Sequence, residues 1–405
     1  MRSDIFRELR LSLNRKTIAV LLLVLLFAFG ISIFEGYQYA DRRQEMMKMR
    51  AMETTGLLMT EETNIPVYES IGGEELRSVL EERVSAMKTM LEGYQTGDAF
   101  LALDGRLASN QLLLEAINLG YPETNQDTEN LELQIQRDQI LKTQHILPID
   151  DLLESHDGVH SVLYLLKTYM LYLLPMVVML LGADRLSGEL RTGSVRFLLQ
   201  FDRPRWKLIT AKAVAVVAWS VVALIGMVIF AFLGGMFFAG PGDFRYPITA
   251  AESFITTGEE TYVSAGILLL RAGVILICGV LFYTSLAILF SCLTRWDIAS
   301  LAGGVVLSVG GAWAIHQWLV STESKVAAVL PFQLADSFGF AMGRLDIPQQ
   351  EQVANTAGLI SSQSTGEILV VGMPFSGLLA CVLLVIWTAL CYALALGIFA
   401  RRDVT

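Results

Sequence analysis

Six long apolar stretches limit what this chain can fold into more than any other feature. They cover residues 17–35, 161–183, 208–239, 266–293, 298–320 and 369–400. A helix needs roughly 20 apolar residues to cross a bilayer core of about 30 Å, and each stretch is about that long or longer. Hydrophobic residues make up 53% of the chain, whereas soluble domains usually contain about 45–50%. The sequence therefore predicts an all-α membrane protein with six transmembrane helices.

Basic residues near the ends of these stretches predict how the chain is oriented. Arg and Lys gather before the first stretch, between the second and the third, and after the last, at Arg401 and Arg402. Cytoplasmic segments carry such an excess, so we expect both termini in the cytoplasm and the protein in the cell (plasma) membrane. The first stretch is longer than a signal-peptide core and no small-residue cleavage site follows it. We therefore expect it to remain as a span.

Residues 36–160, between the first two spans, carry most of the negative charge of the chain. They hold about 23 acidic and about 10 basic residues, against a net charge of −10 for the whole protein. Apolar residues recur there at spacings of three and four, which predicts a large, mainly helical, extracytoplasmic domain. Residues 130–143 fit either a helix or a strand. His145, His156 and His160 lack a fixed further ligand, so we predict no metal site.

Two further segments border the spans. Residues 1–16 place Ile5, Leu9 and Leu13 on one helical face and arginines on the other, as in an amphipathic helix on the membrane surface; a basic flank that only sets topology is the alternative. Residues 321–368 are apolar but broken by Pro331 and Gly339. This pattern favours a broken, re-entrant hairpin in the outer leaflet, with an extracellular loop as the alternative.

Charge inside the predicted spans is scarce. Apart from Glu35 at the very end of the first, they contain no Asp or Glu, and this argues against a proton- or sodium-coupled carrier, which usually holds carboxylates at mid-membrane. Lys167 and Arg271 are the candidate substrate-path charges, although long side chains near span ends also snorkel to the interface. The Gly303-Gly304 and Gly310-Gly311 pairs give the fifth span a face of small residues, for packing within the chain or against a second copy.

Several kinds of chemistry lack their motifs. The sequence has no G-x-x-x-x-G-K-[ST], no H-E-x-x-H and no G-x-S-x-G, which argues against an ATPase, a zinc protease and a serine hydrolase. The basic segments lack the interleaved aromatic residues that nucleic-acid binding would use. We therefore predict a non-enzymatic chain with no catalytic residue, no cofactor of its own and no nucleic-acid partner.

The stretch "GADRLSGELRTGSVRFLLQFDRPRWKLITAK", residues 182–212, combines ordered charge with apolar anchors. Residues 184–207 suit a cytoplasmic interfacial helix that is interrupted near Gly193 and ends before Pro204; a solvated loop is the alternative. The stretch resembles the signature region of ABC-2 type transporter permeases, the membrane subunits of type V ABC exporters. The matching positions are Glu189, Gly193-Ser194-Val195, Leu198-Leu199, Arg205 and Lys212. Asp202 departs from the family pattern, where a proline is usual, and Pro204 lies closer to the arginine.

The resemblance implies a partnership. Two permeases, identical or homologous, pair with two ATPase subunits that bind ATP and magnesium, and the segment after the second span docks on them. The implied ATPase-coupling residues are Glu189, Arg191, Gly193, Arg196, Arg203, Arg205 and Lys212. The expected function is export of a lipid-like, peptide or drug-like substrate, in contact with membrane lipids. The alternative is a mechanotransmission or sensor protein, in which the ATPase acts on the extracytoplasmic domain without substrate conduction.

Overall fold

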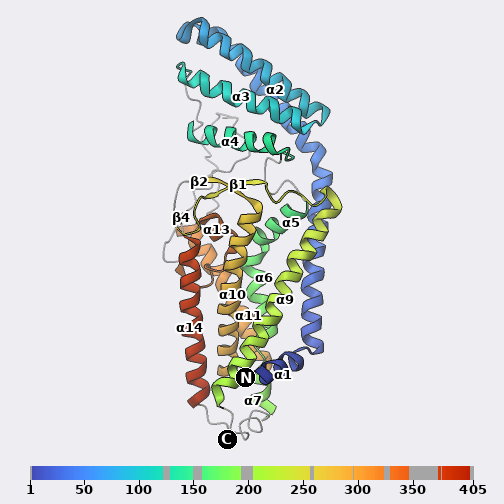
Figure 1. The fold of residues 1–405 in the computed structure, drawn as a ribbon, viewed down its shortest axis with the longest axis vertical. Helices are drawn as coiled ribbons and strands as arrows, with labels where there is room; N and C mark the ends of the chain where they lie inside the picture. The colour runs from blue at the N-terminus through green and yellow to red at the C-terminus, as the bar shows by residue number, and fades with distance from the viewer. Residues whose placement is uncertain are drawn as a thin grey trace.

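The computed structural model describes residues 2–121, 128–148, 157–192, 204–255, 260–294, 296–322, 329–345, 373–374 and 376–401. Within them, six helical segments are long and apolar enough to cross a membrane: Arg15–Tyr39, Gly158–Thr192, Arg205–Ala239, Ala265–Leu293, Asp297–Leu319 and Gly377–Arg401. The six stand side by side as a bundle (Figure 1). The prediction of an all-α membrane protein with six spans is confirmed.

The second span lies at the centre of the bundle. In its most apolar window 67% of the residues are buried, against 22–44% in the other five spans. It is built from consecutive helical pieces: α5 (Gly158–Tyr164), the π-helix η1 (Leu165–Tyr169), α6 (Met170–Gly182) and α7 (Ser187–Thr192). Around it stand α9 (Arg205–Ala239), α10 (Ala265–Leu293), α11 (Asp297–Thr322) and α14 (Gly377–Arg401). A shift of the second span therefore affects most of the bundle.

Two helix starts differ from the apolar stretches. Helix α9 begins at Arg205, because Pro204 adopts an extended conformation (ψ 134°) directly before it, so the last residues of the predicted 184–207 segment belong to the third span. Helix α14 begins at Gly377, later than residue 369, and Met373–Pro374 instead form the short strand β4. Hydropathy alone does not mark these boundaries: α9 starts with the basic residues Arg205 and Lys207, ahead of the apolar run, whereas most residues from 369 to 376 are apolar but precede α14.

Helix α2 (Arg15–Thr96) contains the first span and continues far beyond it (Figure 1). Its helical geometry breaks at Gly73, whose φ of 73° and ψ of −164° suit glycine but strain other residues. After this break the helix folds back on itself, since Arg83 pairs with Glu61 and Lys88 pairs with Glu62 at 2.8 Å. The first span and the region beyond it therefore share one continuous helix up to Gly72.

Helices α3 (Ala99–Asn118) and α4 (Thr128–Gln144) complete the helical region beyond the bundle (Figure 1). Helix α3 packs very closely on α2: a Cβ added at Gly105 would lie 2.3 Å from the backbone nitrogen of Met90. A separate apolar core joins the three helices and includes Leu76, Leu80, Leu107, Leu113 and Leu131. The segment 130–143, which the sequence left open, is helical. The placement of this region outside the cytoplasm stays a prediction.

The two ends of the bundle differ in structure. At one end, which we call the α1 end, helix α1 (Arg2–Ser12) lies across the bundle and packs on α9, and α14 ends at the same end of the bundle (Figure 1). At the other end, strands β1 (Pro247–Ala251) and β2 (Glu260–Ser264) form an antiparallel pair, and β3 (Arg344–Leu345) pairs with β4. Neither strand pair was predicted from the sequence. Short α13 (Ser337–Met342) lies inside this end, while most of the predicted 321–368 hairpin falls outside the described residues.

Candidate coupling site at the α1 end

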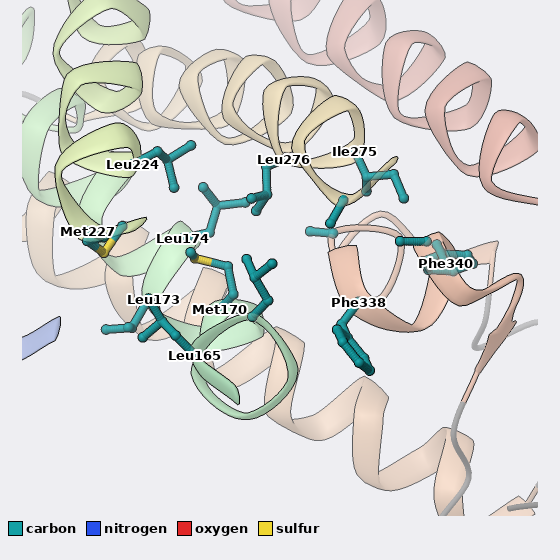
Figure 2. Close-up of a cluster of buried hydrophobic side chains, with 14 of the residues drawn as sticks. Leu165, Met170, Leu173, Leu174, Leu224, Met227, Ile275, Leu276, Phe338 and Phe340 are labelled. Carbon is teal, nitrogen blue, oxygen red and sulfur yellow. The ribbon is translucent and has the colours of Figure 1, made fainter. Parts of the chain in front are cut away.

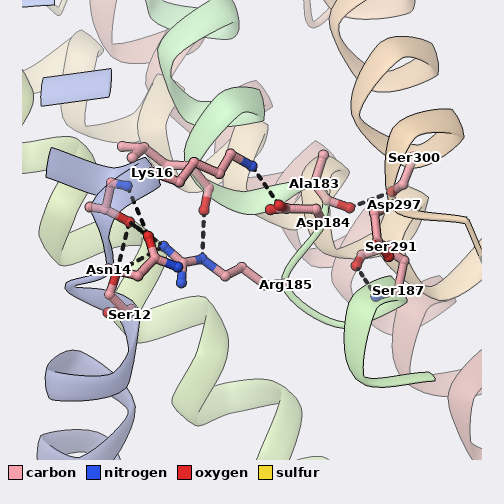
Figure 3. A network of polar contacts seen from close by, with 12 residues as sticks. Ser12, Asn14, Lys16, Ala183, Asp184, Arg185, Ser187, Ser291, Asp297 and Ser300 are labelled. Atoms are coloured by element: carbon pink, nitrogen blue, oxygen red, sulfur yellow. Dashed lines mark hydrogen bonds and ion pairs between the residues drawn. The ribbon is translucent and has the colours of Figure 1, made fainter. Parts of the chain in front are cut away.

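The start of the predicted coupling segment is held by hydroxyl groups of two neighbouring spans. The backbone nitrogens of Leu186 and Ser187 both donate to Oγ of Ser291, near the end of α10, at 2.8 Å. Ser300, in the first turns of α11, donates to the carbonyl oxygen of Ala183 (Figure 3). The turn between α6 and α7 therefore moves with α10 and α11.

Lys212 links three helices through one buried charge. Its Nζ lies 2.5 Å from Oε1 of Glu189 on α7 and 3.5 Å from Oε2 of Glu8 on α1. The Lys212 side chain is only 4% exposed, while those of Glu8 and Glu189 are 15% and 30% exposed. A buried ammonium is costly without a counter-charge, so the two carboxylates hold it in place. We call Glu8, Glu189 and Lys212 the charge hub.

The turn that joins α1 to α2 is tied to the end of the second span. The guanidinium of Arg185 donates to Thr17 Oγ1 at 2.7 Å, to the Ser12 carbonyl at 3.2 Å and to the Leu181 carbonyl at 2.8 Å. Lys16 lies 2.5 Å from the carboxylate of Asp184 (Figure 3). Helix α1 is thus connected both to α9, through the charge hub, and to the second span.

Trp219 forms a further contact between α1 and α9, and it supports a prediction. Its Nε1 donates to Ser12 Oγ at 2.7 Å. Trp219→Phe keeps the ring and removes this donor, which should loosen α1 by about 1 kcal/mol. Hydrogen exchange followed by mass spectrometry should then show faster exchange in peptides from residues 2–12. Trp313→Phe, at an exposed position of α11, is the control; unchanged α1 exchange in Trp219→Phe would contradict the assignment.

Two predicted coupling arginines have partners within the chain. Arg191 pairs with Asp297, the first residue of α11, at 2.9 Å, but its side chain is 63% exposed, so the pair contributes little to stability. Arg205 donates from Nη1 to the carbonyl oxygens of Ala400 at 2.7 Å and Phe399 at 3.2 Å. A cation at these carbonyls satisfies the end of a helix, so Arg205 joins α9 to the end of α14.

The predicted coupling residues thus separate into three groups. Glu189 and Lys212 are brought into direct contact, whereas Arg191 and Arg205 bind elsewhere on the bundle. Gly193, Arg196 and Arg203 lie outside the described residues. Sequence reasoning included Asp184 and Arg185 in the segment 184–207 without naming them as coupling residues, and it missed Glu8, whose only signal was that it lies in a charged flank of the first apolar stretch.

The two candidate substrate-path charges, Arg271 and Lys167, lie toward the end of the bundle opposite the α1 end. They contact different parts of the fold. Arg271 donates to the carbonyl oxygens of Ala251 and Glu252, both at 2.8 Å, and so fixes the end of β1 to α10. Lys167 lies in η1 with its Nζ 5.9 Å from the ring centroid of Phe338. Arg271 therefore has a structural role at least, whereas Lys167 lies beside the apolar contacts of α13.

His160 is also held by its neighbour. The carboxylate of Asp157 accepts from the His160 backbone nitrogen at 2.8 Å and lies 2.8 Å from its Nδ1. This is a helix cap at the start of α5. Among the described residues, no three His, Cys, Asp or Glu side chains gather as a metal site requires.

Comparison with known proteins identifies the family. A family model described as "ABC-2 family transporter protein" matches residues 7–404, nearly the whole chain. Neither curated proteins nor solved structures give a match. The match includes the second span, the coupling segment and the region beyond the bundle, which the sequence resemblance alone had left aside. The chain therefore belongs to the ABC-2 family of transporter proteins and is an ABC-2 type permease.

Proposed function

We propose that this chain is the membrane subunit of an ABC exporter that moves a lipid-like, peptide or drug-like substrate outward. Family membership supports an ABC transporter permease, and such permeases are generally non-catalytic membrane subunits. Hydrolysis then belongs to a separate ATPase dimer, which holds ATP and magnesium. A second permease copy, identical or homologous, completes the transporter. The charge hub is the observation that supports this proposal most strongly.

The hub suggests how force enters the bundle. Helix α7 is joined to α9 through Lys212, to α10 through Ser291 and to α11 through Asp297. A partner that pushes on residues 184–207 would therefore move three spans together. Only contacts that differ between the nucleotide states of the partner can drive such a change. In this proposal Arg196 and Arg203 contact the ATPase, because arginine forks suit carboxylate and carbonyl groups.

The proposal also fixes the orientation. The α1 end carries Arg7, Arg10 and Arg15, all exposed, and such residues favour the cytoplasmic face and its anionic lipids. Both termini are then cytoplasmic, and the helical region of α2, α3 and α4 lies outside the cell membrane. The ATPase would approach the α1 end.

One observation favours a second function, mechanotransmission. Helix α2 continues without a break from Arg15, beside the site, to Gly72 in the region beyond the bundle. Motion at the α1 end could reach α3 and α4 without opening a path for a substrate. ATPase binding is common to both functions, whereas substrate-dependent flux belongs to export alone.

The experiment that tests the proposal is purification of the chain from its native membrane, followed by mass spectrometry of the proteins that accompany it. We expect a P-loop ATPase in near-equal amount. Flux into inverted vesicles that contain both proteins, with ATP and candidate lipid, peptide and drug substrates, then separates export from mechanotransmission. Absence of any ATPase from the purified sample would overturn both functions.

A further inference from the structure

The segment that leads into α13 enters the middle of the bundle without forming a helix. A Cβ added at Gly279, the middle residue of α10, would lie 3.8 Å from Cβ of Ala335. The ring of Phe332 lies 6.0 Å from that of Phe282 and 6.4 Å from that of Tyr283, also on α10. Irregular backbone at this depth is tolerated only where protein covers it or where it lines a path.

Gln333 in this segment is buried, yet its side chain makes no hydrogen bond in the part of the chain that the structure describes. It is 1% exposed, and neither Oε1 nor Nε2 has a partner there. Its backbone is satisfied, because its N–H donates to the Leu330 carbonyl at 3.1 Å and its carbonyl accepts from Asp336 at 2.8 Å. A buried polar group without a partner destabilises the fold, so this amide needs a hydrogen-bond partner from outside the described residues, which a water or a ligand can supply.

Further buried side chains around Gln333 share this property. The hydroxyl groups of Tyr283 and Thr284 on α10, and of Ser337 at the start of α13, also have no hydrogen-bond partner among the described residues. All three residues are at most 2% exposed. Tyr283 lies against Phe332, the residue next to Gln333. Helices α10 and α13 pack against each other, so the four side chains lie on neighbouring parts of the fold rather than at one isolated position.

The surroundings of this group are apolar. Figure 2 draws part of the buried apolar cluster that these elements share, with Phe338 and Phe340 of α13, Met170 and Leu174 of α6, and Ile275 and Leu276 of α10. Binding sites for small molecules commonly combine such a lining with a few polar groups that fix orientation. The neighbouring η1 is a π-helix, a distortion that is frequent at functional sites. This arrangement suits an amphiphilic ligand.

We propose that Gln333, together with Ser337 and Tyr283, binds the amide or hydroxyl group of an amphiphilic substrate, an inference that rests on the proposed export function. A glutamine amide offers both a donor and an acceptor, and a hydroxyl group offers the same pair, which matches an amide or an alcohol. The four side chains are all uncharged, so they match a neutral polar group; the charges printed close to α13, Lys167 and Asp336, contact the Phe338 ring and the Gly339 backbone nitrogen instead. The shared chemistry can come from a lipid or from an apolar peptide.

The test is photolabelling of the full chain, with its ATPase, in nanodiscs. Three diazirine probes are used: an N-acyl amino alcohol, an N-acyl apolar dipeptide and a plain alkane. We expect the first, the second or both to label peptides that contain residues 329–342 or Tyr283. Gln333→Leu should reduce that labelling about tenfold, as for the loss of one buried hydrogen bond, and leave alkane labelling unchanged.

Matched variants keep the result interpretable. Gln317→Leu makes the same change on an exposed face of α11 and should have no effect on labelling. Thermal unfolding of each variant shows whether it folds, and Ser337→Ala serves as the second variant should Gln333→Leu not accumulate. Preferential labelling by the lipid probe or by the peptide probe identifies the source of the ligand.

The proposed binding site would be wrong if the two amide probes labelled the wild type and both site variants equally. It would also be wrong if they did not label these peptides at all. Either result leaves the proposed function intact as long as the ATPase still accompanies the chain. Loss of the ATPase from the wild type would instead remove the proposed function itself.

Discussion

Lys212→Met is expected to abolish stable association with the ATPase. The substitution keeps the length of the side chain but leaves the carboxylates of Glu8 and Glu189 facing each other without the ammonium between them. Removing one partner of a buried pair costs about 3–5 kcal/mol, and we expect a value near the lower limit because Glu189 is 30% exposed. Since about 1.4 kcal/mol already changes an equilibrium tenfold, co-purified ATPase should fall at least that far. Quantitative mass spectrometry of the purified complex measures the ratio.

Two controls accompany this prediction. Lys142→Met makes the same change at an exposed pair with Asp104, 2.8 Å away, and should leave the ATPase ratio unchanged, because exposed pairs contribute little. The double variant Lys212→Met/Glu189→Gln removes a carboxylate that the single variant leaves unpaired, and it should recover part of the association. A Lys212→Met chain that retains all its ATPase would show that the charge hub does not organise the docking segment.

Arg106→Leu is expected to destabilise the helical region beyond the bundle more than any surface change. Arg106 on α3 donates from Nε and Nη2 to both carboxylate oxygens of Asp138 on α4, at 2.7 and 2.8 Å. Asp138 is fully buried, and its other basic neighbour, Arg137, lies 3.6 Å away. Leaving this carboxylate without its bidentate partner should cost about 3–5 kcal/mol. Hydrogen exchange in peptides from α3 and α4 measures the loss.

A double variant shows whether Arg106 stabilises this region through its ion pair with Asp138 or through the packing of its side chain. In Arg106→Leu/Asp138→Leu both charges are absent, and replacing a buried pair by apolar residues is often close to neutral. The double variant should therefore exchange more slowly in α3 and α4 than the single variant. If both variants exchange equally fast, the single variant acts through lost packing of the arginine stem and not through the stranded carboxylate.

The membrane fold was largely predictable, because a span needs a long apolar run and hydropathy reports that directly. The starts of α9 and α14 could not be predicted from hydropathy, since α9 begins at basic Arg205 before its apolar run and the apolar run of α14 begins before its helix. Helix α2 was divided in the prediction into a span and a separate domain, because charge appears after residue 35. The structure shows that a change from apolar to charged sequence does not require a break in the helix. The fold-back at Gly73 depends on a backbone angle, not on polarity.

The site was predictable only in part. The resemblance to the ABC-2 signature region indicated Glu189 and Lys212 as coupling residues, and the structure places them in contact. It gave no indication of Glu8 or of the bonds from Arg185 to Ser12 and Thr17, since those contacts depend on how α1 crosses α9. Gln333 could not be predicted either. In the sequence, an amide in an apolar segment looks like an ordinary loop residue until its burial and its lack of hydrogen-bond partners among the described residues are known.

The unbroken first part of α2 has a mechanical consequence. From Arg15 to Ile65, before Pro66, a helix rises about 75 Å at 1.5 Å per residue, over twice the thickness of the bilayer core. If this rod pivots at its foot, where Thr17 and Lys16 contact the second span, a tilt of about 5° displaces its far end by about 7 Å. A tilt of α2 that is too small to change the packing of the six spans would thus move α3 and α4 by more than the length of a side chain.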